Sequence, residues 1–442
     1  MYNFTKHKER KNFCMHCLQC FYSNISLAKH QKDCILINGV QAIELPKPYI
    51  DKNGQERIPS VYFKNHSKQL PVPFVIYADF ESITEKMFTC RPSDQKSYTE
   101  KYQKHTGCSF GYKVVCHYDK KYSKDVVIYR GIDPVGEFIK CMTREVQNCQ
   151  KVIRENFNRP LIMSEEDEIN FEKATHCHIC EKKYKPDDDP SKEQVRDHCH
   201  VTGKYRGSAH KKCNFKLKIS AENIKIPVIF HNLKGYDSHC IIEKIGELTK
   251  EEEPVSIKVI PCNSEKYMAF YIGKHLNFID SFQFMSRSLE KLASNLSEEQ
   301  LIYTKEYFSD NSQFQLMKEK GVYPCDYMDS FSKFNDAQLP KREDFYSLLN
   351  DENISNDDYS HARNVWNTFG IRDMREYHDL YLKSDILPLA DVFENFRKTC
   401  LSNYGLDPPR YVTSKGLAWD AMLKMTKINL DLITDIDMQL FY

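Results

Sequence analysis

Short apolar runs and longer amphipathic stretches alternate along the chain and predict a mixed α/β protein. Before residue 160, period-2 patterns predict three strands and a 3.6-residue period predicts one helix, at Phe74–Ala78, Ser109–Tyr118, Val126–Tyr129 and Pro134–Asn156. After residue 225 the pattern predicts a strand, a helix and two more strands, at Pro227–Phe230, Ser238–Leu248, Ser256–Pro261 and Met268–Asp280. From Leu289 onward the pattern is mostly helical. These elements predict a mixed sheet with flanking helices.

Residues 160–225 interrupt this pattern with acidic, Cys/His-rich and then basic sequence. Three strands, a helix, a fourth strand and a second helix follow the element order of a ribonuclease H-like fold, with the insertion just before the fourth strand. Proline-containing sequence separates a small N-terminal module from this domain. We therefore expect a module at 1–40, a linker at 41–72, a main domain at 73–159 and 226–400, an insertion at 160–225, and a further segment at 401–442.

Composition is that of a globular protein with more than one core. The 442 residues are 41% hydrophobic, which predicts two or three domains. The net charge of +1 does not by itself indicate a nucleic-acid partner. One local patch does stand out, because residues 204–218 hold six Lys or Arg and no acid, whereas residues 165–193 hold ten acids. A solvated loop of mixed charge explains the same pattern.

The apolar runs are too short to predict a membrane crossing, and the first residues lack the apolar region of a secretory signal. An intracellular, reducing location, in the nucleus or cytoplasm, is therefore expected, with no membrane partner. In that setting the 17 cysteines are interpreted as metal ligands and buried thiols rather than disulfides.

Two sets of cysteine and histidine have the spacing of structural Zn²⁺ sites. Cys14, Cys17, His30 and Cys34 have the spacing of a zinc finger, with Phe21 and Leu27 at its apolar core positions and Cys in place of the last His. DNA anchoring and protein docking both remain open for this finger. The second set consists of two pairs about 30 residues apart, which fits a closed tetrahedral site; its members are Cys177, Cys180, His210 and Cys213.

Acidic residues at predicted element ends suggest a second kind of metal site. Asp79 and Glu81 are two apart at a strand end, so both side chains point to one face. Asp237 follows the fourth strand, and Tyr381 and Asp385 share one helical face. Four acids converging on two Mg²⁺ or Mn²⁺ ions would suit phosphodiester hydrolysis.

The three motifs Asp-Phe-Glu, Asn-x4-Asp and Tyr-x3-Asp, in this order, resemble the exonuclease motifs of B-family DNA polymerases. The resemblance implies a 3′-5′ proofreading exonuclease. Its metal ligands would be Asp79, Glu81, Asp237 and Asp385; Tyr381 would orient the water and Asn232 would bind the single-stranded 3′ end. Ser288 and Leu289 resemble the primer-end motif of the protein-primed branch, which implies contact with DNA.

Residues 404–438 resemble the segment that leads from exonuclease to palm in Polinton/Maverick-type transposon polymerases. The resemblance implies the N-terminal part of a DNA-directed DNA polymerase, with 401–442 as the start of a truncated palm domain. Its partners would be a DNA 3′ end, a primer-template and a terminal protein primer. The catalytic palm motifs do not occur in the sequence, so we expect no polymerisation by this chain.

Within the insertion, Asp197-His198-Cys199-His200 and Asn214 resemble the His-Asn-His nucleases of the phage recombination-endonuclease family. The resemblance implies His198 as general base, with Asp197 and Asn214 holding Mg²⁺. A zinc-stapled module that only holds DNA is the alternative, and the basic patch suits that role through Lys204, Arg206, Lys211 and Lys212.

Two interpretations of the whole chain remain beside the exonuclease. One is a zinc-dependent DNA-binding remnant of a mobile element, in which the carboxylates are only fold residues. The other is a structure-specific endonuclease that works through the insertion. Release of nucleotides from a 3′ end distinguishes the first from the exonuclease, and cleavage of a closed circle would favour the second.

Overall fold

The computed structural model describes residues 12–38, 44–51, 53–87, 103–185, 190–248, 256–262 and 266–435. Internal contacts divide the chain into two compact units. One consists of Met1–Lys64 with Met422–Tyr442, and the other of Asn65–Ala421. Each unit is therefore described by itself.

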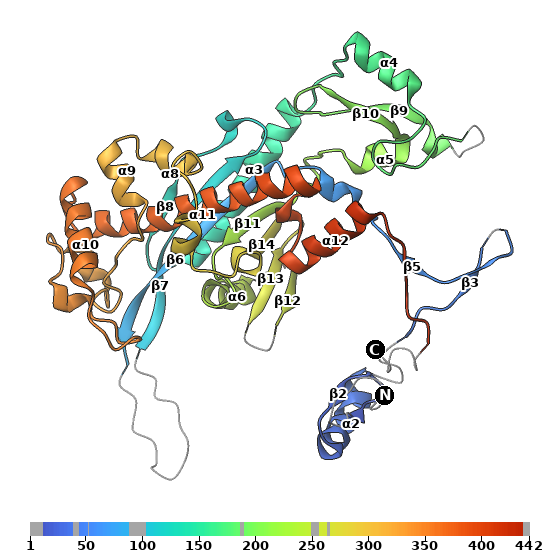
Figure 1. The fold of residues 1–442 in the computed structure, drawn as a ribbon. Coiled ribbons are helices and arrows are strands. Elements are labelled where there is room, and N and C mark those ends of the chain that lie inside the picture. The colour runs from blue at the N-terminus through green and yellow to red at the C-terminus, as the bar shows by residue number, and fades with distance from the viewer. Residues whose placement is uncertain are drawn as a thin grey trace. The chain divides into compact units, whose positions relative to one another are not determined.

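The larger unit is built on a seven-stranded mixed sheet (Figure 1). In spatial order its strands are β12 (Ile257–Pro261), β13 (Tyr267–Ile272), β14 (Leu276–Asp280), β11 (Ile226–Phe230), β6 (Phe74–Lys86), β7 (Gln103–Cys116) and β8 (Val127–Arg130). The central strands β14, β11 and β6 are parallel, whereas β6–β7–β8 and β12–β13–β14 are antiparallel. Both faces of β11 are buried, as expected of a central parallel strand.

Two strand predictions are corrected by this sheet. The predicted strand at 268–280 is a hairpin, because Gly273, with φ of 59°, turns the chain between β13 and β14. Asp79 and Glu81 do not lie at a strand end, since β6 continues to Lys86 by pairing with β7 as far as Gln103. The predicted helix Pro134–Asn156 (α3) has the predicted bounds, and the Asp133 carboxylate accepts a hydrogen bond from Gly136 N at its start.

Alternate residues of β6 pack into two different cores. Phe74 and Ile76 lie in the core that includes residues of α3, whereas Val75 and Tyr77 lie in the core beneath α11 (Met374–Tyr404). Asp373 caps the start of α11, and Gly405 ends it with φ of 58°. The other helices of eight or more residues in this unit are α4 (Glu165–Lys173), α6 (Asp237–Leu248), α10 (Asn356–Thr368) and α12 (Ser414–Thr426), of which α12 extends past the unit's boundary. Short helices are α5 (Lys211–Lys216), α7 (Leu289–Ala293), α8 (Ile302–Tyr307) and α9 (Asn311–Met317).

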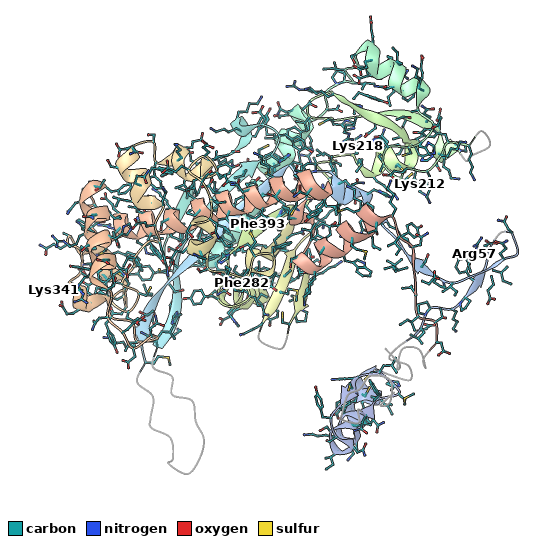
Figure 2. The ribbon with its side chains drawn as sticks, in the orientation of Figure 1. Arg57, Lys212, Lys218, Phe282, Lys341 and Phe393 are labelled. Carbon is teal, nitrogen blue, oxygen red and sulfur yellow. The ribbon has the colours of Figure 1, made fainter. Side chains whose placement is uncertain are left out.

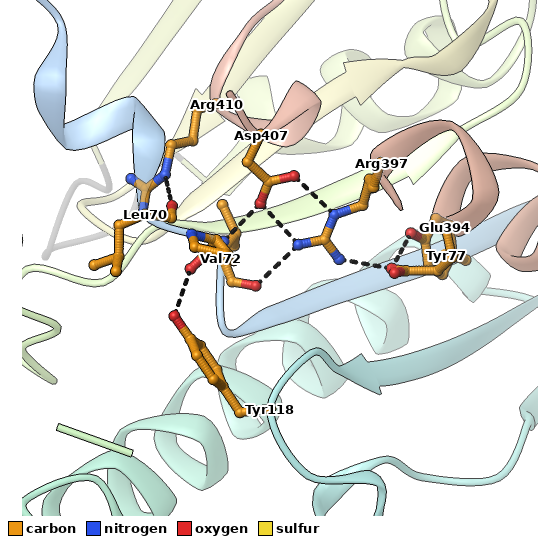
Figure 3. Close-up of polar contacts among 9 residues, drawn as sticks. Leu70, Val72, Tyr77, Tyr118, Glu394, Arg397, Asp407 and Arg410 are labelled. Carbon is orange, nitrogen blue, oxygen red and sulfur yellow. Dashed lines mark hydrogen bonds and ion pairs between the residues drawn. The ribbon is translucent and has the colours of Figure 1, made fainter. Parts of the chain in front are cut away.

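A buried polar network fixes the C-terminal part of α11 against the start of β6 (Figure 3). Arg397, 1% exposed, donates from Nε and Nη2 to both carboxylate oxygens of the fully buried Asp407, at 3.0 and 2.8 Å. It also donates to Glu394 and to the Val72 carbonyl, at 2.7 and 3.1 Å. Tyr77 donates to the same Glu394 carboxylate oxygen. Because α11 carries Tyr381 and Asp385, this network helps to place the candidate site.

The predicted insertion lies within the larger unit, and its buried apolar residues belong to the same core as those of the sheet. Its antiparallel strands β9 (Gln194–His198) and β10 (Tyr205–His210) are followed by α5, and α4 contacts β10 (Figure 1). Ser164 caps α4 in a capping box with Asp167.

The smaller unit contains the N-terminal finger and two strand pairs. In the finger, β1 (Asn12–Phe13) pairs with β2 (Cys20–Phe21), and α2 (Asn24–Asn38) follows. The predicted linker includes β3 (Tyr49–Ile50), which pairs with β4 (Glu56–Arg57), and β5 (Ser60–Val61), which pairs with β15 (Leu430–Asp431). No described helix combines the length and apolar character that a membrane span requires.

Candidate carboxylate site and zinc-binding clusters

Three of the four predicted carboxylates meet where α11 crosses β6. Asp79 and Glu81 project from alternate positions of β6, and Asp385 projects from α11. One carboxylate oxygen from each lies within 4.8 Å of the others. Residues more than 300 positions apart in the sequence therefore form one group of hard oxygen ligands.

Asp237 lines the same cavity, of about 710 Å³, as these three carboxylates. It is the first residue of α6, on the segment that follows β11, and it is buried. Its Oδ1 has no hydrogen-bond partner. A buried carboxylate oxygen without a partner is costly unless a cation balances it.

Burial raises the pKa values of all four acids, and repulsion within the group adds to the shift for Asp79 and Glu81. Burial, followed by the charges of Asp237 and Asp385, raises the pKa of Asp79 well above its usual range. Burial raises the pKa of Asp237 to about 8, with a further contribution from Asp280. It likewise raises the pKa of Asp385 to about 7, although Lys320 and a hydrogen bond from Tyr381 oppose the shift.

These residues fit a divalent-cation site by their chemistry. Mg²⁺ and Mn²⁺ prefer carboxylate oxygens, and a cation would relieve the repulsion that raises the pKa values. The orphaned Oδ1 of Asp237 offers a ligand with no competing partner. Asp79, Glu81, Asp237 and Asp385 are thus the residues that could hold the ions.

Three other predicted site residues, Asn232, Leu289 and Tyr381, line this cavity. The loop that carries Asn232 has a closely constrained backbone. Asn232 has a positive φ of 69° and is exposed, and its N–H donates to the buried Asp280 carboxylate at 2.8 Å. A Cβ at Gly235 would come within 2.5 Å of the Asn232 side chain, so only glycine fits there without a shift. Leu289 also lines the cavity. Its predecessor Ser288 caps α7 by accepting a hydrogen bond from Lys291 N at 3.4 Å.

Tyr381 lies one helical turn before Asp385 and also lines the cavity. Its ring stacks on Tyr323, with 4.8 Å between the centroids. The charge of Asp385, followed by burial, raises its pKa well above the usual range, so the phenol keeps its proton.

Two residues near this site were missed by sequence reasoning. Lys320 lines the cavity, and its charge opposes the rise in the pKa of Asp385 that burial causes. Asp280 receives backbone hydrogen bonds from Asn232, Lys234 and Phe282, and so positions the loop that leads to Asp237. A single lysine in a loop has no sequence pattern that would mark it as a site residue. Asp280 could have been found, because it stands at the end of an apolar run.

The N-terminal cluster brings together Cys14, Cys17, His30 and Cys34, whose ligand atoms all lie within 4.8 Å of one another. Cys14 Sγ lies 3.9 Å from Cys34 Sγ, and Cys17 Sγ lies 3.1 Å from His30 Nε2. Burial raises the pKa of Cys14, but hydrogen bonds from the backbone of Cys17 and His16 outweigh this and lower it to about 7. The thiolate that a metal requires is therefore favoured, and the cluster could hold Zn²⁺.

The cluster in the insertion is formed by Cys177, Cys180, His210 and Cys213, again within 4.8 Å. His210 Nδ1 lies 3.4 Å from Cys180 Sγ and 4.0 Å from Cys213 Sγ, near the separation of about 3.6 Å that a tetrahedral zinc site gives an N and an S ligand. Burial and the charge of Cys177 raise the pKa of Cys213 to about 12, as expected of thiols crowded together without a cation. This cluster could also hold Zn²⁺. No disulfide bond joins the cysteines in the described part of the chain.

The predicted nuclease residues of the insertion make contacts other than those expected of metal ligands. Asp197 is fully buried, and both of its oxygens accept hydrogen bonds from Arg206, at 2.9 and 2.7 Å. His178 Nε2 lies 2.9 Å from the same carboxylate. Among the described residues, Asp197 joins no cluster of potential metal ligands. The rings of His198 and His200 are tilted at 46° to each other with 4.6 Å between their centroids, and Asn214 lies on α5.

The predicted basic patch is mostly solvent-exposed. Lys204, Lys211 and Lys212 are exposed, with Lys211 3.7 Å from Glu193. Figure 2 shows Lys212 and Lys218 on the part of the module that carries α5. Arg206 departs from this pattern, because two nitrogens of its guanidinium group already bond Asp197.

No curated protein and no solved structure gives a significant match to the chain. One family model does match, over a stretch that begins seven residues before the predicted insertion at 160–225 and ends one residue after it. Residues 153–226 are similar to the recombination endonuclease VII family.

Proposed function

We propose that this chain is a metal-dependent nuclease that degrades single-stranded DNA from its 3′ end. In this proposal it is the exonuclease-bearing N-terminal part of a B-family, protein-primed DNA polymerase. The observation that carries the proposal is the carboxylate group of Asp79, Glu81 and Asp385, with Asp237 and Tyr381 lining the same cavity.

The sheet supports a ribonuclease H-like assignment for this domain. Strands β8, β7 and β6 form an antiparallel ribbon, and β11 pairs in parallel with β6 on its other side. Strand β11 is parallel to β6, and Ile229 pairs with Tyr77, so the carboxyl edge of β11, after which Asp237 follows, lies beside the middle of β6 that carries Asp79. Sites at this edge are common in open α/β sheets.

The cavity residues have separate roles in the proposed reaction. Asp79, Glu81, Asp237 and Asp385 would hold divalent cations, which supply charge stabilisation and an activated water when bound. Tyr381 keeps its proton and donates a hydrogen bond to Asp385, so its phenol oxygen can accept a hydrogen bond from the attacking water and orient it. Lys320 places a positive charge where the phosphate would lie. Asn232, exposed beside the cavity, would bind the last nucleotide of the strand.

The test is release of mononucleotides from a 5′-labelled primer with a frayed 3′ end, with Mg²⁺ or Mn²⁺. Asp79→Ala should lower the rate at least about 10²-fold, as loss of one preorganised stabilising group commonly does. Glu85→Ala is the matched control, because Glu85 lies on the same strand but does not line the cavity. If Asp79→Ala with Glu81→Ala leaves nucleotide release unchanged, the activity lies elsewhere.

The insertion provides a second candidate function, a structure-specific endonuclease, which the match at residues 153–226 favours. Cleavage of closed circular or branched DNA, which lacks a free 3′ end, would reveal it. His198→Ala should abolish that cleavage and leave 3′ nucleotide release intact. The engagement of Asp197 by Arg206 argues that the module instead holds DNA through its exposed lysines.

A further inference from the structure

A second cavity, of about 470 Å³, lies between the β7–β8 connection and α8. Its size is within the range of small-molecule sites. It shares no lining residue with the carboxylate cavity. Its lining is dominated by four lysines and two tyrosines, namely Lys113, Lys120, Lys121, Lys124, Tyr303 and Tyr307.

Lys113 is the unusual member, because it is buried without an ion pair among the described residues. Its ammonium group donates to the Lys124 carbonyl at 3.1 Å and lies 5.5 Å from the centroid of the Tyr303 ring. Two acids, Asp125 and Asp391, favour the charged form of Lys113 without forming an ion pair with it. The carboxylate oxygens of Asp391 already accept hydrogen bonds from Tyr303 N and from the N and Oγ1 of Thr304. One carbonyl satisfies only one of the three ammonium hydrogens.

The other three lysines are each paired with an acid, so Lys113 is the lysine of the lining that has no ion pair among the described residues. Lys120 pairs with Glu306, Lys121 with Asp119, and Lys124 with Glu145. Asp125 and Glu306 are the two acids in the lining, against four lysines. Burial lowers the pKa of Lys113, so an anion in the cavity would favour its charged form and offset the cost of burying it.

We propose that this cavity binds a phosphate group carried by a nucleotide or by a nucleic-acid strand. A lysine is a point-charge ligand for phosphate, and the remaining ammonium hydrogens of Lys113 can donate to the oxygens of a phosphate in the cavity that it lines. Lys121 is exposed and could exchange its partner Asp119 for a phosphate, and the two tyrosines of the lining offer aromatic surface to a base.

The experiment measures binding of dTMP and of a labelled oligothymidine to the full chain, without added divalent metal. The Asp79→Ala background keeps nucleotide from being held by cations at the carboxylate site, so this test is independent of the proposed nuclease activity. Lys113→Met should weaken binding at least tenfold. Lys305→Met is the matched control, because Lys305 is exposed on α8 but does not line the cavity, and it should bind as the background does.

The two probes distinguish the sources of the phosphate. Equal weakening for dTMP and the oligonucleotide indicates a nucleotide site, and weakening for the oligonucleotide alone indicates a strand-binding site. Unchanged affinity of Lys113→Met for both probes overturns the proposal. If that variant fails to fold, Lys121→Gln decides, with a two- to fivefold loss expected and an unchanged affinity counting against the site.

Discussion

Asp237→Asn should make the metal-free protein more stable at neutral pH, although it alters a buried residue. The physical reason is that Oδ1 of Asp237 has no hydrogen-bond partner and its carboxyl has a pKa of about 8 in the fold. A raised folded pKa means that stability is fully present below the unfolded value of 3.8 and is lost as the pH rises towards 8.

The magnitude follows from this linkage. Between the unfolded pKa and pH 7 lie about three pH units, and each unit corresponds to about 1.4 kcal/mol. The wild-type penalty at pH 7 is therefore up to about 4 kcal/mol, and asparagine, which cannot ionise, removes it. At pH 4 the two proteins should differ little.

Urea unfolding at pH 4 and pH 7, with and without Mg²⁺, measures the effect. The urea midpoint of Asp237→Asn should exceed that of the wild type at pH 7 only without Mg²⁺, because the ion stabilises the wild type by binding the folded state. Glu85→Gln, on β6 but outside the cavity, should show no such pH dependence. A lower midpoint for Asp237→Asn at pH 7 in the absence of metal would refute the reasoning.

Three further predictions follow from other contacts. Tyr381→Phe should slow nucleotide release less than Asp79→Ala, because it loses one hydrogen bond while the carboxylates remain; an equal loss in the primer assay contradicts this. Cys177→Ser should lower the zinc content by one ion per chain in elemental analysis, and an unchanged content would exclude the second cluster as a zinc site. Arg397→Met should lower the free energy of unfolding by about 3–5 kcal/mol, since it leaves the Asp407 carboxylate buried and unpaired, whereas Arg397→Met with Asp407→Leu should recover much of that loss in urea titrations.

Local sequence patterns determined much of the fold. Helix α3 has its predicted bounds because a cap at Asp133, a proline in its first turn and an apolar stripe all act within a few residues. The two ligand sets also assemble as their spacing predicts, since each pair of cysteines is separated by a single turn. The sequence pattern predicted the hairpin turn and the length of the strands less well. The turn at Gly273 was missed inside an apolar run, and β6 runs past Asp79 because of its partner β7.

Only the tertiary structure decided where groups distant in the sequence lie and which partners they contact. The order of the carboxylate motifs suggested a common site, but the crossing of α11 over β6 sets the separation between Asp385 and Asp79, and Lys320 enters the cavity from a loop with no signal of its own. Within the insertion, the sequence offered Asp197 as a metal ligand, whereas the pairing of β9 with β10 brings Arg206 onto its carboxylate. Charge and spacing are properties of the sequence, but a carboxylate binds whichever partner the fold brings nearest.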